Sequence, residues 1–218
     1  MKILDSKLRN FNKKLEDLLL RRKTKVQTSS ISVTRIINDV KKNGDKALLK
    51  YEKKFNQNRV IKPSFKQIKK SINSLDPKVK NAIDLAYSRI YKFHSLQKFK
   101  NISYIDKLRN KLEYKYLPIE SVAIYVPGSS ASYPSSVLMN AIPAIVAGVK
   151  RIIMINPGYK GKQNAAVLYA AKKCKIKEIY SIGGPSAIAA VAYGTKKINR
   201  VNKICLLYTS PSPRDDVI

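Results

Sequence analysis

The sequence has little cysteine, one histidine, no tryptophan and no long apolar run. Its two cysteines, Cys174 and Cys205, cannot build a disulfide framework or a cysteine-based zinc site, which favours a reducing compartment. No apolar stretch approaches the length of a membrane span, and residues 1–14 lack the uninterrupted apolar core of a secretory signal. We therefore expect a cytoplasmic protein that has no membrane partner.

Acidic residues are also scarce, since 14 Asp and Glu stand against 44 Lys and Arg, a formal net charge of +30. Such an excess suggests nucleic-acid binding when it gathers on one face. Here the basic residues are spread along the whole chain, without a zinc-finger spacing or the signature of an RNA-recognition sheet. We expect a solvated basic surface and no nucleic-acid partner, and we keep a basic nucleic-acid-binding module as an alternative.

Glycine is almost missing from the first part of the chain, where Gly44 alone precedes Gly128. Apolar residues at helical spacing predict a helical region over residues 1–106. The expected helices are one over residues 8–19, one from Ser29 or Ser30 to Asn43-Gly44, one from Asp45 with Leu48, Tyr51 and Phe55 inward, and one from Asp76-Pro77.

The pattern changes in the second part, residues 107–204. Residues 112–116 alternate as in a β-strand, and short apolar runs then alternate with helical patterns. The expected strands are residues 121–126, 151–155 and 178–182, and the expected helices are residues 134–147, 163–174 and 185–193. The sequence therefore predicts an α/β fold, in which a helical region is followed by a Rossmann-like parallel βαβαβα segment.

Two of the predicted strand ends have loops of small residues. Ligands of open parallel sheets bind at the carboxyl ends of the strands, near helix amino ends. The residues expected to meet a phosphate or nucleotide are Tyr125, Gly128 and Ser129 after one strand and Gly183, Gly184 and Ser186 after another. The sequence has no G-x-G-x-x-G, and glycine and serine also occupy such turns for backbone reasons alone. Asn156-Pro157-Gly158, after the strand between them, is interpreted as a plain turn.

Several blocks of the sequence resemble the histidinol dehydrogenase family. They are IYVPG, YPSSVLMNAIPAIVAGVKRI, IGGPSAIAAVAYGT and KINRVNKI, together with Gly44-Asp45, Tyr51, Phe55 and Phe93-His94 with Gln97 upstream. The resemblance covers residues from about 30 to 204. It implies a fold of the aldehyde-dehydrogenase-like class. It also implies an NAD-dependent, zinc-requiring homodimer that oxidises L-histidinol through histidinal to L-histidine.

The resemblance also assigns site residues. Tyr125 and Ser186 fall on cofactor-contact positions of the family, but Ser186 stands where the family has Gln, and Ser129 stands where it has a second Gly. A serine lacks the reach and the two donors of a Gln amide, so an NAD contact is lost or passes through water. These departures leave open a related dehydrogenase of another small alcohol. We expect no catalytic residue and no zinc ligand in this chain, and we expect His94 to cap or pack.

The resemblance stops at Ile204. Residues 205–218, which begin CLLYTSPSPRD, look like the translation of a sequencing-library adapter. We therefore expect an incomplete sheet and a truncated chain that is inactive by itself, because the family's zinc ligands and its acid–base pair belong to a later part of the sequence.

Overall fold

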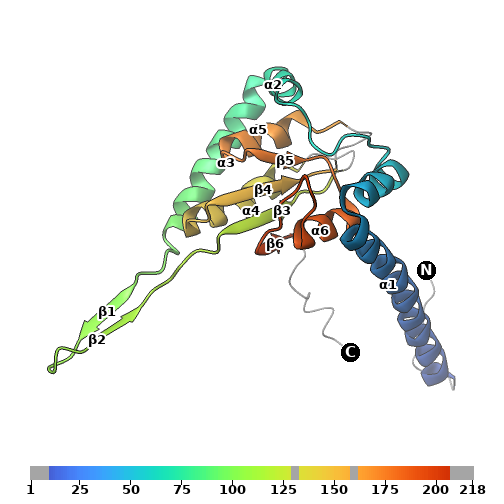
Figure 1. Ribbon diagram of the computed structural model, residues 1–218, viewed down its shortest axis with the longest axis horizontal. Coiled ribbons are helices and arrows are strands. Elements are labelled where there is room, and N and C mark those ends of the chain that lie inside the picture. Colours follow the sequence, from blue (N-terminus) through green and yellow to red (C-terminus); the bar gives the residue numbers. More distant parts are fainter. Residues whose placement is uncertain (1–9, 129–132, 158–161, 207–218) are drawn as a thin grey trace.

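The structure is a computed structural model that describes residues 10–128, 133–157 and 162–206, without the side chains of residues 17–31. Its centre is a parallel sheet with helices on both faces, and a two-stranded hairpin extends away from this body (Figure 1). The predicted α/β fold, with helices first and a parallel sheet second, is confirmed.

The first helix, α1, spans Phe11–Tyr51 and combines three predicted helices. The helix start expected at Ser29 or Ser30 is wrong. No Gly or Pro lies between Phe11 and Asn43, and a serine inside a helix costs only tenths of a kilocalorie, so nothing ends the helix there. The break expected at Gly44 is confirmed, because its φ of 53° and ψ of −130° are not helical.

A π-helical turn, Glu52–Asn56, continues α1. A π-turn holds one more residue than an α-turn, so it shifts which side chains face inward. Phe55 was expected to point inward but is 57% exposed, whereas Glu52 is buried. The prediction for Phe55 is therefore wrong, and a carboxylate occupies part of the inner face.

Two more helices precede the sheet. Helix α2, Phe65–Asn73, was not predicted, although Ser64 and Gln67 form a capping box that the sequence displays. Helix α3, Pro77–Ser95, begins where expected, because Asp76 Oδ1 accepts a hydrogen bond from Lys78 N at 2.7 Å and Pro77 occupies the first helical position.

Four parallel strands form the sheet, in the order β5-β4-β3-β6. They are β3 (Ser121–Tyr125), β4 (Arg151–Ile155), β5 (Glu178–Tyr180) and β6 (Lys203–Cys205), and the helices between them are α4 (Pro134–Ala147), α5 (Ala165–Lys173) and α6 (Gly184–Tyr193). The short strand β6 was not predicted, and it extends one residue into the segment expected to be an adapter-derived tail. The rest of that segment, from residue 207, lies outside the described residues.

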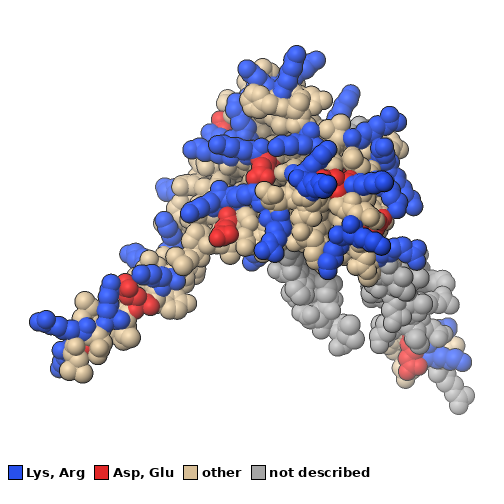
Figure 2. Space-filling view, viewed as in Figure 1, with Lys and Arg blue, Asp and Glu red and all other residues tan. Residues whose placement is uncertain are grey.

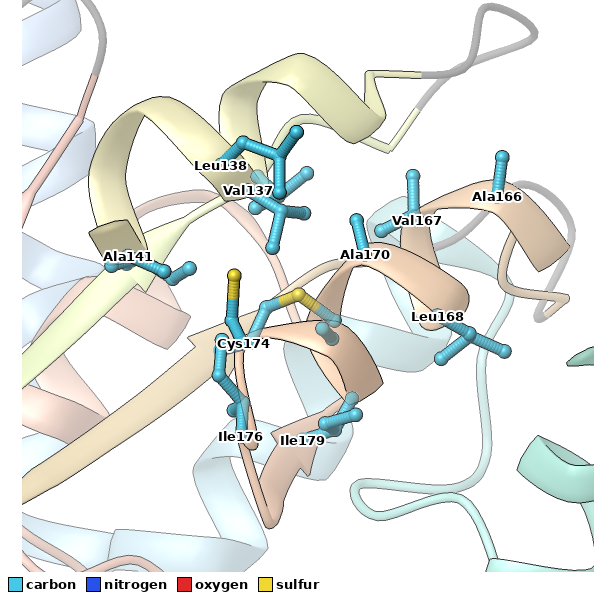
Figure 3. Packing of buried hydrophobic residues seen from close by; sticks show 14 of the residues in the cluster. Val137, Leu138, Ala141, Ala166, Val167, Leu168, Ala170, Cys174, Ile176 and Ile179 are labelled. Atoms are coloured by element: carbon cyan, nitrogen blue, oxygen red, sulfur yellow. The ribbon is translucent and has the colours of Figure 1, made fainter. Parts of the chain in front are cut away.

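The sheet is buried on both faces. On one face α2, α3, α4 and α5 cover β3 and β4, with Ile124 and Met154 in the cluster that Figure 3 shows from close by. On the other face α1 and α6 pack against Ala123 and Ile153. Neighbouring residues of one strand thus alternate between two cores, as the pleat of a strand requires.

The hairpin of β1 (Ile102–Ile105) and β2 (Lys111–Tyr114) is antiparallel and exposed along its whole length. Strand β2 begins one residue before the strand predicted at residues 112–116, and β1 falls in the last residues of the segment predicted to be helical. In Figure 2, Lys and Arg are spread over the hairpin and the body of the molecule instead of forming one patch on the visible face. No helix within the described parts is long and apolar enough to cross a membrane.

Candidate functional site

The carboxyl end of β3 is where the order of the strands reverses. From β3 the chain proceeds outward to β4 and β5, and then crosses back to place β6 on the other side of β3. Ligands of doubly wound α/β folds bind in the crevice at such a switch point. Tyr125, the last residue of β3, is half-buried at this position.

Tyr125 joins two of the predicted strand ends. Its hydroxyl accepts a hydrogen bond from the backbone N–H of Gly184 at 3.1 Å, so the end of β3 meets the amino end of α6. Gly184 has a φ of +66°, which glycine adopts without strain, and the space where a Cβ would point is open. The structure therefore brings Tyr125, Gly183 and Gly184 together at one edge of the sheet.

Ser186 lies in the same turn but faces inward. It is 2% exposed, and its hydroxyl donates a hydrogen bond to the carbonyl oxygen of Gly183 at 3.1 Å. The side chain thus closes the first turn of α6. Gly128 is half-buried after β3, and the predicted site residue Ser129 lies outside the described residues.

Glu52 belongs to this edge, although we did not predict it. One carboxylate oxygen accepts from Gly183 N at 2.9 Å and the other from Asn56 Nδ2 at 2.7 Å. Burial raises the pKa of Glu52 above its ordinary value, and these two hydrogen bonds oppose that rise. A signal existed in the sequence, because Glu52 stands four residues after the inward-facing Leu48.

The segment interpreted as a plain turn also helps to build the site. Asn156 is buried, and its Nδ2 donates to the carbonyl oxygens of Val126 at 3.0 Å and Pro127 at 3.3 Å. The ends of β3 and β4 are thereby tied together. Pro157 packs against Gly183, where an added Cβ would lie 2.7 Å from the Pro157 Cβ. The plain-turn interpretation of Asn156-Pro157 was therefore wrong.

Three polar atoms at this edge have no hydrogen-bond partner among the described residues. They are Asn156 Oδ1, Gln163 Oε1 and Ser136 Oγ, from residues that follow β4, precede α5 and open α4. A buried polar atom without a partner costs about 1–3 kcal/mol, so such atoms favour a water molecule or a ligand nearby. Their place fits a polar ligand at the carboxyl edge.

His94 lies far from this edge, in the last turn of α3, where its Nδ1 is 2.7 Å from Gln97 Oε1. It lines a cavity of about 770 Å³, together with Phe99, Tyr116 and the end of α4. Within the described ranges, no three His, Cys, Asp or Glu side chains are grouped so that they could hold a metal ion.

The strand order, the two covered faces and the site at the end of β3 define a doubly wound α/β protein. A family model described as histidinol dehydrogenase matches residues 19–205, so the chain belongs to the histidinol dehydrogenase family.

Individual relatives agree with this family. The chain is 79% identical over 204 residues to the histidinol dehydrogenase of Pelagibacter ubique, covering 94% of this chain and 48% of that protein. It is 44% identical to the Acinetobacter baylyi histidinol dehydrogenase, over 79% of this chain and 41% of the relative. A crystal structure of histidinol dehydrogenase from Elizabethkingia anophelis matches with a TM-score of 0.76 and 37% identity, over 80% of this chain and 41% of that one. The chain thus spans about half the length of the curated relatives it matches.

Proposed function

We propose that this chain supplies the NAD-binding part of a histidinol dehydrogenase. The complete activity in this proposal is the NAD-dependent, zinc-requiring oxidation of L-histidinol through histidinal to L-histidine, the last steps of histidine biosynthesis. Membership of the family supports it, as do relatives that carry the name histidinol dehydrogenase.

The contact between Tyr125 and Gly184 is the observation that carries the proposal. It places an aromatic side chain and an open glycine turn side by side at the switch point of the sheet. An aromatic ring there can stack on a base or sugar, and the oxygens of Asn156 and Gln163, which have no hydrogen-bond partner among the residues that the structure describes, offer acceptors at the same edge. When bound, NAD would supply the hydride acceptor for alcohol oxidation.

In this proposal, part of the active site lies outside this chain. Zinc ligands and acid–base residues would come from the half of the relatives' length that the chain does not span, so the chain alone would be inactive. We propose a homodimer in the cytoplasm that acts on a small-molecule substrate. We further propose that residues 1–106 are a helical region that packs on the sheet, that residues 107–204 are the partial NAD-binding segment, and that residues 205–218 are an adapter-derived tail.

Isothermal titration of the chain with NAD⁺ tests the cofactor assignment. Because aromatic stacking on a base contributes about 1–3 kcal/mol, Tyr125→Ala should weaken NAD⁺ binding about tenfold. Tyr104→Ala, on the exposed hairpin, is the matched control and should leave the affinity unchanged. Equal affinities for wild type and Tyr125→Ala would refute the role of Tyr125.

The substrate is tested on the complete protein that contains this sequence. Formation of NADH and L-histidine from L-histidinol and NAD⁺ would support the proposal. Turnover of another small alcohol, with none of L-histidinol, would favour the related dehydrogenase that the resemblance left open at Ser129 and Ser186.

A further inference from the structure

Glu52 is a buried carboxylate that pairs with dipoles instead of a cation. It is 1% exposed, and each of its oxygens accepts one N–H, from Gly183 and from Asn56. Among the ion pairs of the described residues, none includes Glu52. A buried charge is costly unless its surroundings compensate for it, so the groups around Glu52 must stabilise its carboxylate.

The compensation comes from the amino end of α6. The first N–H groups of a helix have no partner inside it, and the helix dipole places a partial positive charge there. At the start of α6, the N–H of the capping residue Gly183 donates to Glu52, the N–H of Gly184 donates to Tyr125, and Pro185 has no N–H. An anion from within the chain therefore already holds the place where helices bind phosphate.

The turn is also fixed in space. A Cβ on Gly183 would lie 2.7 Å from Pro157 Cβ and 3.4 Å from Asn56 Nδ2, so both residues are packed against it. The extended φ of −153° at Gly183 shows that close approach, not an unusual backbone angle, requires glycine here. A diphosphate could reach Gly183 only by displacing Glu52. Gly184, by contrast, faces open space.

We propose that Glu52 is a built-in anion that fills the amino end of α6, positions the Gly183–Gly184 turn and keeps diphosphate groups away from it. The turn then meets an uncharged part of the dinucleotide through Gly184 and Tyr125. Glu52 is thus a positioning residue. The inference rests on the proposed function, since NAD is the ligand that the turn would receive.

Chemical rescue tests the built-in anion. Glu52→Ala removes the acceptor of Gly183 and leaves a space near the size of a small carboxylate. The melting temperature should fall by about 5 °C. Formate should restore more of this loss than equimolar formamide or sodium chloride, and inorganic pyrophosphate should stabilise the variant more than the wild type. Equal rescue by formate and formamide, or none by either, would overturn the proposal.

A second pair of variants covers the case in which Glu52→Ala does not fold. Glu52→Gln keeps an acceptor for Gly183, and Asn56 can rotate its amide to accept from the new N–H₂, so the variant loses the negative charge but not the hydrogen bonds and should melt below wild type for that reason. Adding Asn56→Asp returns a carboxylate that accepts from the new amide, and this double variant should recover most of the loss. A Glu52→Gln protein that melts like wild type would contradict the proposal.

Titration with NAD⁺ distinguishes a failure of the proposed NAD-binding function from a failure of the positioning role of Glu52. Glu52→Gln should bind NAD⁺ about fivefold more weakly than wild type, and the double variant should regain affinity, because a displaced turn moves Gly184. If wild type binds no NAD⁺, the proposed function fails and the rescue experiment decides the built-in anion. If wild type binds and Glu52→Gln binds equally well, the positioning role fails.

Discussion

The parallel sheet and the β1–β2 hairpin use similar residues with opposite results. Strand β3 reads SVAIY, and four of its five residues are buried, whereas β1 reads ISYI and is exposed throughout. Helices cover β3 and β4 on both faces, while the hairpin extends away from the body (Figure 1). Strand-forming residues thus give the extended conformation in both places, but the topology alone decides which of them form a core.

The largest expected difference between the two regions is the effect of a large-to-small substitution. Ile124 in β3 is fully buried, so Ile124→Ala should lower the free energy of unfolding by about 2–5 kcal/mol. Ile105 in β1 is 61% exposed, so Ile105→Ala should change it by less than about 0.5 kcal/mol. Urea unfolding followed by circular dichroism measures both, and equal losses would end the distinction between the sheet and the hairpin.

The same contrast explains which parts of the fold the sequence could predict. The strands of the sheet are short apolar runs between helical patterns, and β3, β4 and α4 lie where they were expected. The hairpin strand β1 and the edge strand β6 have no such signal, because exposed or partly exposed strands of three or four residues do not need an apolar run. Pairing with a distant partner, as β6 pairs with β3, is not written in local sequence.

The candidate site divides in a similar way. Tyr125 and Gly184 were predicted because strand ends and glycines are visible in the sequence, and the structure brings them together. Glu52 and Asn156 were missed, since their importance comes from hydrogen bonds to residues 131 and 30 positions away. A polar residue on a helix or in a turn is expected to be solvated until the fold shows what it contacts.

The close contact between Gly183 and Pro157 should have the next largest effect on stability. Gly183→Ala should lower the free energy of unfolding by about 1–3 kcal/mol, because the new Cβ would lie 2.7 Å from Pro157 Cβ and 2.9 Å from its Cγ. Adding Pro157→Ala should restore part of that loss. A double-mutant cycle by urea unfolding gives the coupling. Additive losses would show that the turn does not depend on this contact.

The ion pairs of the body and of the hairpin should contribute differently to stability as the pH changes. In the body, Arg151 Nε and Nη2 donate to the two oxygens of Glu178 at 2.7 and 2.8 Å, and this pairing holds the pKa of Glu178 below its ordinary value of 4.5. A lowered pKa stabilises the fold above pH 4.5, and this stabilisation disappears as the pH falls through the folded value. Glu178→Gln should therefore cost about 1–2 kcal/mol at pH 7 and less at pH 3.

The matched change on the hairpin is Glu113→Gln. Glu113 pairs with the largely exposed side chains of Lys111 at 3.0 Å and Lys115 at 3.3 Å. Exposed pairs contribute about 0–1 kcal/mol, so this variant should show little change in stability at either pH. Melting curves across pH values compare the two variants, and parallel pH profiles for both would mean that the Arg151–Glu178 pair has no special role.

A small stabilising effect is expected at the tip of the hairpin. Arg109 has a φ of +64°, a left-handed conformation that costs a residue with a Cβ about 1–2 kcal/mol, whereas Gly adopts it freely. Arg109→Gly should stabilise the hairpin by about 0.5 kcal/mol after the greater unfolded-state entropy of Gly is subtracted. The exposed hairpin contributes nothing to the core, so it should open independently of the sheet. Amide exchange should therefore slow in β1 and β2 and stay constant in β3. Slower exchange in β3 would show that the two regions are coupled, although one is exposed and the other is buried.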